Sequence, residues 1–184
     1  EIAYQLAANR IAVISGLARG IDAIAHRAAL QAAGRTVAAL ACGLDIVYPP
    51  EHAKLAREII ESGALVSDYA LGTQPRGEYF PRRNRILSGM SLGVLVVEGD
   101  VKSGALITAS AAVDQNRDLF CVPGHIYSRT SRGTNFMIKK GAKLVAGAED
   151  ILEEYNITLA KTPRVIKPEN ETEAKILAVL TGEP

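Results

Sequence analysis

The chain has 184 residues, and its 21 lysine and arginine residues nearly balance its 20 aspartate and glutamate residues. Apolar residues make up 48% of the chain and charged residues 22%, which is the usual balance of a soluble globular protein. No signal-peptide pattern is present, and no apolar run approaches the ~20 residues that a membrane helix needs. These totals exclude a membrane-embedded protein and predict a cytoplasmic chain with one core and a tail.

Six short apolar runs rich in β-branched residues alternate with segments of helical periodicity. The runs predict strands at 11–15, 36–41, 64–68, 94–99, 119–124 and 143–147. Helices are expected at 21–33, 51–61, 83–91, 105–116 and 134–140. The strand runs lack polar alternation, which indicates that both faces of the sheet are covered. The sequence therefore predicts an α/β fold with a doubly wound, mostly parallel sheet, an extended Rossmann-like fold.

The two ends of the sequence differ from this pattern. Residues 1–10 have the pattern of the last turns of a helix without a cap, so a strand and loop are expected to precede them. Residues 156–170 contain two prolines and no apolar period, which is typical of a linker. Residues 171–184 begin a helical pattern that stops at its turn. We expect a domain over 1–155, a linker, and the start of a truncated further module.

Three loops that follow strands carry glycine, hydroxyl and basic residues. In parallel sheets such loops lead into helix N-termini, which favour anions. Because the three loops share one edge of the sheet, they favour a ligand that carries phosphates, although each alone could be a tight turn with a cap such as Asp22. The candidate binding residues are Ser15, Gly16 and Arg19 in "SGLARG", and Lys102, Ser103 and Gly104 in "KSG". The third loop is "VPGHIYSRTSRGTN".

The stretch "FPRRNRILSG" at 80–89 concentrates positive charge just before a predicted strand. A helix starting near residue 83 would have a basic first turn, which the helix dipole disfavours, so the cluster indicates function rather than folding. The aromatic pair before it could stack on bases or could be core residues in a loop. The candidates are Phe80, Arg82, Arg83, Asn84 and Arg85, and one of the arginines is expected to support the others internally.

No catalytic group stands out. Cys42 and Cys121 lie inside strand runs and are expected to be buried and reduced, rather than in a disulfide or metal site. His26, His52 and His125 have no triad or metal-ligand spacing with other residues. We therefore predict no enzymatic activity, no metal and no cofactor.

A basic run extends from 128 to 143, with five lysines and arginines and no acidic residue. The run is either a solvated loop face or a surface for a partner.

Six motifs together resemble one family, the bacterial DNA-processing protein A (DprA/Smf) of natural transformation. They are "SGLARGIDAIAHRAAL", "CGLDIVYPPEH", "FPRRNRILSG", "VVEGDVKSGALITA", "FCVPG" and "RGTNFMIKKGAKLV", in the family's order and spacing over about residues 1–155. The resemblance implies a Rossmann-like domain that binds and protects incoming single-stranded DNA, forms a homodimer and helps load the RecA recombinase, without catalysis. It places the DNA pocket at "FPRRNR", "SGLARG" and Lys102.

The resemblance has two departures and one extension. The family's first strand and its glycine-basic turn are absent, and the family's frequent asparagine after "YPxE" is His52 here. Pro50 stands where some members carry a basic residue. The unfinished pattern at 171–184 is similar to the start of the winged-helix module that many members append.

The main alternative is an enzyme on the same fold, a nucleotide-cleaving phosphoribohydrolase of the "lonely guy" type. That class has a Pro-Gly-Gly run followed by Gly-Thr and a glutamate base, whereas "PGH" and "GTN" stand apart here with no glutamate at helical reach. A dinucleotide oxidoreductase is disfavoured because the fingerprint glycines and the acidic ribose partner are missing.

Overall fold

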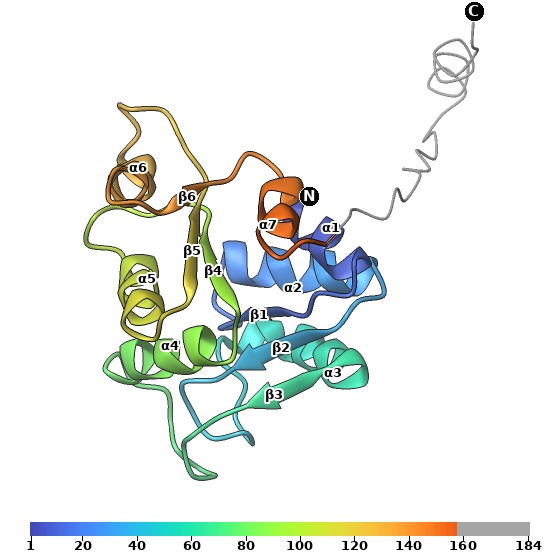
Figure 1. Ribbon diagram of the computed structural model, residues 1–184. Helices are drawn as coiled ribbons and strands as arrows, with labels where there is room; N and C mark the ends of the chain where they lie inside the picture. Colours follow the sequence, from blue (N-terminus) through green and yellow to red (C-terminus); the bar gives the residue numbers. More distant parts are fainter. Residues whose placement is uncertain (158–184) are drawn as a thin grey trace, which may run out of the picture.

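The computed structural model describes residues 1–157, which form parallel strands connected by helices (Figure 1). The strands are β1 (Val13–Ser15), β2 (Thr36–Ala39), β3 (Ala64–Val66), β4 (Gly93–Val96), β5 (Asp118–Cys121) and β6 (Lys143–Leu144). The α-helices are α1 (Ile2–Ala8), α2 (Ile21–Gln31), α3 (Ala53–Ser62), α4 (Tyr79–Gly89), α5 (Gly104–Asp114), α6 (Arg132–Lys139) and α7 (Ala148–Glu154). Two short 3₁₀ helices, η1 (Pro50–His52) and η2 (Arg129–Ser131), precede α3 and α6.

The strands pair in two parallel ladders, β1-β2-β3 and β4-β5-β6. Val13 lies opposite Thr36 in the first ladder, and Gly93 lies opposite Asp118 in the second. Figure 1 shows α5 and α6 on one side of β4 and β5, with α1 and α7 on the other. The predicted α/β class with parallel strands is confirmed. The described strands form two hydrogen-bonded sheets of three strands each, and β1 and β4 are not hydrogen-bonded to each other.

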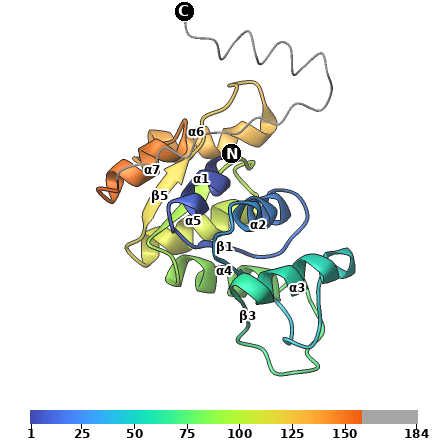
Figure 2. The same ribbon diagram turned by 90° about the vertical axis from the view of Figure 1, so that its right-hand side faces the viewer.

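Three apolar clusters hold these layers together. The largest joins α2, β2 and α3 through buried side chains that include Ala23, Leu40 and Ile59. A second packs α5 against β4 and β5 around Ala109 and Cys121. The third places Phe120 of β5 against α1 and α7, and Figures 1 and 2 show these two helices side by side. Helices from both ends of the described chain therefore cover the same part of the second sheet.

The end of the described chain is fixed to the second sheet by Tyr155. Its hydroxyl donates a 2.8 Å hydrogen bond to Oδ2 of Asp118, and its ring lies edge-on to Phe120 at 6.2 Å. Burial and the Asp118 carboxylate raise the pKa of the Tyr155 hydroxyl. Apart from residues 156 and 157, the predicted linker (156–170) and the predicted further module (171–184) lie outside the described residues.

The helix that carries the arginine cluster begins earlier than predicted. It starts at Tyr79 instead of residue 83, so Tyr79 and Phe80 lie in its first turn and not in a loop. Pro81 does not prevent this, because a proline in the first turn removes only an amide that has no helical partner. The first turn is therefore less basic than predicted, since Arg82 is its only basic residue, and Arg83 and Arg85 follow it.

Both cysteines are buried and free, as predicted. Burial raises the pKa of the Cys121 thiol to about 11. Between residues 1 and 157 no helix is long and apolar enough to cross a membrane.

Candidate nucleic-acid interface

The "SGLARG" loop after β1 is held in a defined shape by its neighbours. Oδ2 of Asp22 accepts hydrogen bonds from the amides of Gly16 (3.0 Å) and Ala18 (3.1 Å). Leu17 is fully buried and has a φ of 58°, an uncommon conformation for a residue with a side chain. Nδ1 of His52 lies 2.9 Å from the Leu17 carbonyl oxygen, which fixes the loop from the other side. The predicted N-cap role of Asp22 was wrong, because the N-cap of α2 is Gly20 and Asp22 lies in the first turn of the helix. Its carboxylate instead occupies the Gly16 and Ala18 amides of the loop.

Arg83 of α4 is an internal support for this loop. Its side chain is buried, with the residue only 4% exposed. Nη1 donates to the Gly16 carbonyl oxygen at 2.8 Å and to the carbonyl oxygen of Ala39 at the end of β2. Burial lowers the pKa of the Arg83 guanidinium, and the Asp22 carboxylate opposes this shift. Arg83 thus ties α4 to the ends of β1 and β2.

Gly16 is required by this arrangement. A Cβ atom at this position would lie 2.6 Å from Cζ of Arg83, well inside van der Waals contact. The guanidinium is enclosed and cannot move away without losing its two carbonyl partners. The glycine that the sequence assigned to phosphate binding has a close-packing role in the structure.

Arg19 and Phe80 form the outer part of the same region. Nε of Arg19 lies 2.5 Å from Oε1 of Glu51 in an exposed ion pair, and this hydrogen bond raises the pKa of Arg19. The Phe80 ring is edge-on to the Tyr48 ring, with the two ring centroids 5.8 Å apart. The Arg83 guanidinium lies over the Phe80 ring, with Cζ 5.8 Å from the ring centroid. Phe80 is half-buried, so its ring is anchored by packing and only partly available for stacking.

The remaining residues of the cluster differ in their partners. Nη2 of Arg85 lies 2.7 Å from Oδ2 of Asp68, in an ion pair whose arginine side chain is 59% exposed. Arg82 is exposed, and within residues 1–157 its side chain has no hydrogen bond or ion pair. Asn84 accepts a 3.2 Å hydrogen bond from Nε of Arg83 and reaches the Gly104 carbonyl oxygen at 3.4 Å. Of the three arginines, one is buried, one is paired and one is free.

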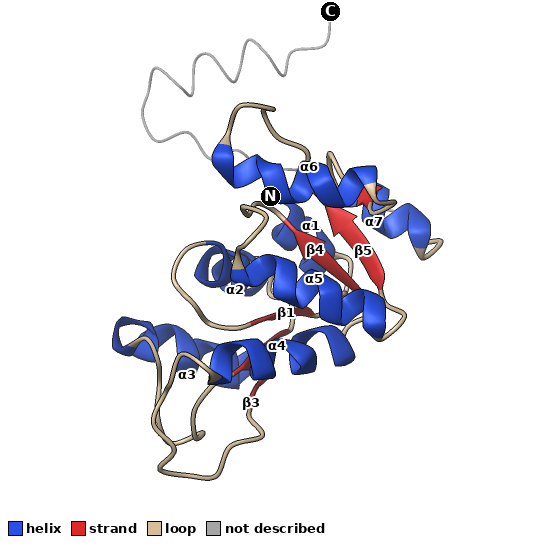
Figure 3. Ribbon diagram, turned by 90° about the vertical axis from the view of Figure 1, so that its left-hand side faces the viewer, coloured by secondary structure: helices blue, strands red, loops and turns tan. Residues whose placement is uncertain are grey.

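The contact between Asn84 and Gly104 joins α4 to the N-terminus of α5. Figures 1 and 3 show the two helices side by side. Ser103 is the N-cap residue of α5, and its Oγ is buried with no hydrogen-bond partner in the part of the chain that the structure describes. Lys102 precedes it on an exposed turn and has no ion pair among the described residues. The "FPRRNR" and "KSG" segments therefore adjoin, as the sequence predicted.

The loops after β4 and β5 are bound to each other. The Gly99 amide donates to the Thr130 carbonyl oxygen (2.6 Å), and the Gly133 amide donates to the Gly99 carbonyl oxygen (2.9 Å). Nε of Arg129 lies 2.8 Å from Oδ2 of Asp100, and this hydrogen bond lowers the pKa of Asp100. The three strand-end loops are thus connected in series through Arg83, Asn84 and Asp100.

The "CGLDIVYPPEH" loop was not among the candidate binding segments predicted from the sequence. Tyr48 packs on Phe80, Glu51 pairs with Arg19, and His52 binds the Leu17 carbonyl. Only Glu51 had a recognisable local signal, and that signal suited a helix N-terminus equally well. The loop forms one wall of the region because β2 pairs with β1.

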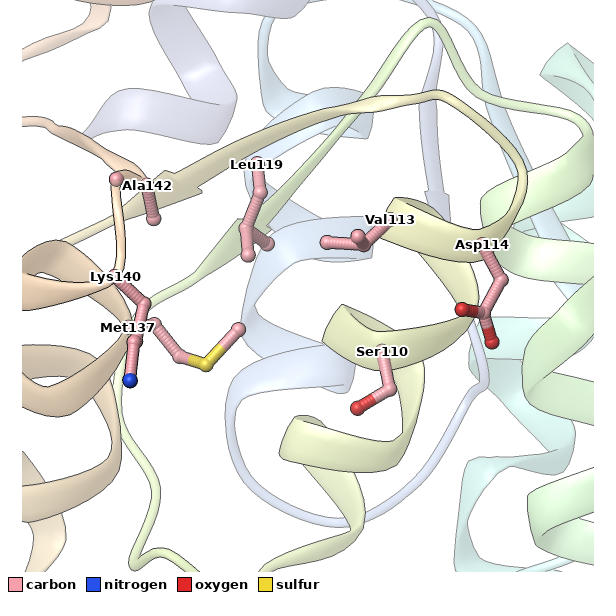
Figure 4. Close-up of a pocket in the computed structure, with 8 residues that line it drawn as sticks. Ser110, Val113, Asp114, Leu119, Met137, Lys140 and Ala142 are labelled. Carbon is pink, nitrogen blue, oxygen red and sulfur yellow. The ribbon is translucent and has the colours of Figure 1, made fainter.

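Other features of the described chain lie away from this edge. Within residues 1–157 no group of three or more His, Cys, Asp or Glu side chains is placed to hold a metal. A hollow between α5 and α6 is lined by the side chains of Val113, Leu119 and Met137, with Lys140 beside them (Figure 4). It lies toward the C-terminal ends of both helices, whereas the candidate residues are at the N-terminus of α5.

The fold and this edge define an α/β protein whose strand-end loops carry basic, hydroxyl and aromatic groups. The family model of DNA recombination-mediator protein A matches residues 1–156. The chain belongs to this family, which also includes Protein Smf of Escherichia coli. It is 48% identical to that protein over 166 residues, which is 90% of this chain and 44% of Protein Smf. The chain thus spans less than half of that relative.

Two solved structures have the same fold. DNA processing protein A from Streptococcus pneumoniae superposes with a TM-score of 0.77 and is 41% identical, covering 83% of this chain and 54% of the other. DNA processing protein A from Helicobacter pylori superposes with a TM-score of 0.76 and is 31% identical, covering 84% of this chain and 70% of the other. The Helicobacter structure was described for its single-stranded DNA binding mode.

Proposed function

We propose that this chain binds single-stranded DNA along the edge formed by α4, the "SGLARG" loop and the N-terminus of α5. One observation carries the proposal: Arg82 and Lys102 are exposed on adjoining elements, and neither has a carboxylate partner within residues 1–157. Cations in this position have no evident role in folding, whereas phosphates would neutralise them. The Helicobacter relative's binding of single-stranded DNA supports the same conclusion.

The candidate residues have different roles within this proposal. Arg82, Lys102 and the Arg85 side chain would contact phosphates, because they are exposed on the edge. Ser103, whose Oγ is buried, would position the start of α5. Arg83, Asn84, Gly16 and Gly104 would position the elements that carry those groups. Ser15 is the last residue of β1, directly before the loop. Arg19 and Phe80 would form the outer part of the same edge. Membership of the family supports the further proposal of a cytoplasmic homodimer that protects incoming DNA and helps load a RecA-type recombinase.

We expect Arg82→Ala to weaken binding of single-stranded DNA regardless of base sequence. If Arg82 neutralises one phosphate, the slope of log K against log salt should fall by about 0.7. Titration of a labelled oligonucleotide at several salt concentrations measures both quantities. Arg57→Ala is the matched control, because Arg57 is exposed on α3, away from this edge. Equal affinity of the Arg82→Ala variant and the parent protein at every salt concentration would remove Arg82 from the site.

We propose binding without catalysis, against the phosphoribohydrolase alternative. Three carboxylates of the edge are each paired with an arginine and so are not free to act as a base: Glu51, Asp68 and Asp100. Incubation with a nucleoside monophosphate should release no free base, as followed by chromatography. Release of base that depends on protein concentration would contradict the proposal.

A further inference from the structure

The loop between β5 and α6 exposes a group of large side chains that the proposed site does not include. Ile126 is 72% exposed and Tyr127 is 81% exposed. The rings of His125 and Tyr127 lie 5.5 Å apart at an interplanar angle of 47°. Exposed aromatic rings next to each other leave apolar surface in water, which is unfavourable unless a partner covers it.

The loop that carries these rings is fixed at both ends. Asn135 of α6 binds Gly124 twice, with Oδ1 accepting from the amide at 3.2 Å and Nδ2 donating to the carbonyl oxygen at 2.9 Å. The Ser128 amide donates to the His125 carbonyl oxygen at 2.9 Å, which closes a turn around Tyr127. Thr130 accepts the hydrogen bond from the Gly99 amide. A turn held in this way presents its rings at a low cost in conformational entropy on binding.

The surroundings of the rings are basic. Arg132 is exposed at the first position of α6, where the helix dipole disfavours a cation. Arg132 has no ion pair within residues 1–157, and the same holds for Lys102 on the neighbouring loop. Arg129 does pair, with Asp100. The loop therefore combines flat apolar faces with cations that form no ion pair among the described residues.

The loop is also continuous with the proposed DNA edge. Arg129 binds Asp100, which lies four residues before Gly104, and Gly104 receives the hydrogen bond from Asn84 of α4. Figure 3 shows the loops after β4 and β5 at the same end of the sheet as the start of α5. A nucleic-acid strand on α4 and "KSG" would reach the rings by following the carboxyl ends of β4 and β5.

We propose that His125 and Tyr127 form a base-stacking platform that extends the binding surface for single-stranded DNA, with Lys102 and Arg132 holding the intervening phosphates. This inference rests on the proposed function and assigns it a second contact region. Stacking requires unpaired bases that can turn toward a ring, so the platform selects single strands over duplex. The adjoining positive charge favours a polyanion over an apolar protein surface.

The test uses oligothymidines of increasing length with the full chain. For oligonucleotides long enough to reach both regions, Tyr127→Ala should weaken binding by about 5- to 150-fold, the range for loss of one base–aromatic stack. For the shortest oligonucleotides, which occupy the α4 region alone, the affinity should be unchanged. Tyr127→Phe should keep the parent affinity, whereas Tyr127→Leu should behave as Tyr127→Ala, because leucine is apolar but has no π face.

Salt dependence separates the rings from the charges. Tyr127→Ala should leave the salt slope unchanged, whereas Arg132→Ala should lower it by about 0.7 for long oligonucleotides. Tyr127→Ala with parent affinity at every length would overturn the platform while leaving the proposed function intact, provided that Arg82→Ala still weakens binding. Parent affinity in the Tyr127→Leu variant, or a change of oligomeric state in Tyr127→Ala seen by light scattering, would also overturn it, since both indicate an apolar protein contact. Failure of the parent protein to bind any single strand would overturn the proposed function and the platform together.

Discussion

Arg83→Ala is expected to lower the free energy of unfolding by roughly 3 kcal/mol, far more than any other arginine substitution in the "FPRRNR" segment. The guanidinium is buried and satisfies the carbonyl oxygens of Gly16, in the loop after β1, and of Ala39, at the end of β2. Truncation would leave two buried acceptors without donors and a cavity beneath Phe80. The loss should appear as a lower midpoint in urea unfolding with an unchanged slope.

The neighbouring arginine provides the control. Arg82 is exposed and has no partner within the described residues, so Arg82→Ala should change the free energy of unfolding by no more than about 0.5 kcal/mol. The free energy of unfolding of Arg83→Lys should lie between those of Arg82→Ala and Arg83→Ala. Lysine keeps the charge but lacks the planar guanidinium that donates to two carbonyl groups. Equal stability of the Arg82→Ala and Arg83→Ala variants would contradict the internal role of Arg83.

DNA binding distinguishes a positioning role of Arg83 from a phosphate contact. If Arg83 only holds the loop and α4 together, Arg83→Ala should weaken binding of single-stranded DNA without changing the salt slope. A slope that falls by about 0.7 would instead mean that the guanidinium leaves its buried position and holds a phosphate. The free energy of unfolding and the salt slope of DNA binding, measured together, therefore distinguish the role of Arg82 from that of Arg83.

The second large effect is a loss of stability on acidification, caused by His26. Nδ1 of His26 lies 2.6 Å from Oγ1 of Thr36. The Thr36 hydroxyl donates its proton to the Val13 carbonyl oxygen, so Oγ1 accepts from His26 and Nδ1 must be the protonated ring nitrogen. Nε2 is buried and has no partner in the described part of the chain. Burial lowers the pKa of His26 to about 4; Asp22 opposes this shift, and His52 and Arg83 add to it.

The sign of the effect follows from this shift. Between the ordinary pKa of 6.5 and about 4, the unfolded chain binds a proton at His26 and the folded chain does not. The free energy of unfolding should therefore fall by about 3 kcal/mol as the pH drops through this window, and this contribution should level off below it. Urea unfolding at a series of pH values measures the slope.

His26→Gln should remove most of this pH slope, because glutamine cannot take up a proton. The control is His125→Gln, which changes a histidine on the exposed β5–α6 loop and should leave the slope as it is in the parent. An unchanged slope in the His26→Gln variant would show that another group controls acid stability.

The stability effects expected for Arg83 and for His26 have a common structural origin. Arg83 binds the Gly16 carbonyl oxygen of the "SGLARG" loop, and His26 is linked through Thr36 to Val13 of β1, which leads into that loop. Burial lowers the pKa of both side chains, and the Asp22 carboxylate opposes this shift in both. The loop thus rests on buried polar groups in addition to the apolar cluster that holds Leu17. We infer that its shape is stable at neutral pH and is lost when His26 or Arg83 loses its partners.

Much of the fold could be read from the sequence because it depends on local patterns. Apolar β-branched runs and helical spacing gave the α/β class and all six strands, although each predicted strand was longer than the observed one. The start of α4 was missed because Pro81 and two aromatics resemble a loop in sequence, while packing of Phe80 on Tyr48 favours the helix.

The candidate edge was also predictable in outline, since the carboxyl ends of parallel strands collect the loops that follow them. The motifs placed "SGLARG", "FPRRNR" and "KSG" together, and the structure joins them through Arg83 and Asn84. The exposed pair on the β5–α6 loop was not recognised, because His125 and Tyr127 are two positions apart and only the observed turn brings their rings together.

By itself the sequence determined the layer architecture, the position of the basic edge and the absence of triad or metal-ligand spacing, since these follow from periodicity, composition and order. Only the tertiary structure decided the roles of individual side chains. Arg82, Arg83 and Arg85 are chemically identical and lie within four positions, yet one is exposed, one is buried on two carbonyl groups and one is paired with Asp68. The reason is physical: whether an arginine meets solvent, a carbonyl or a carboxylate depends on which strand ends and loops pack against its helix, and those segments are distant in the sequence.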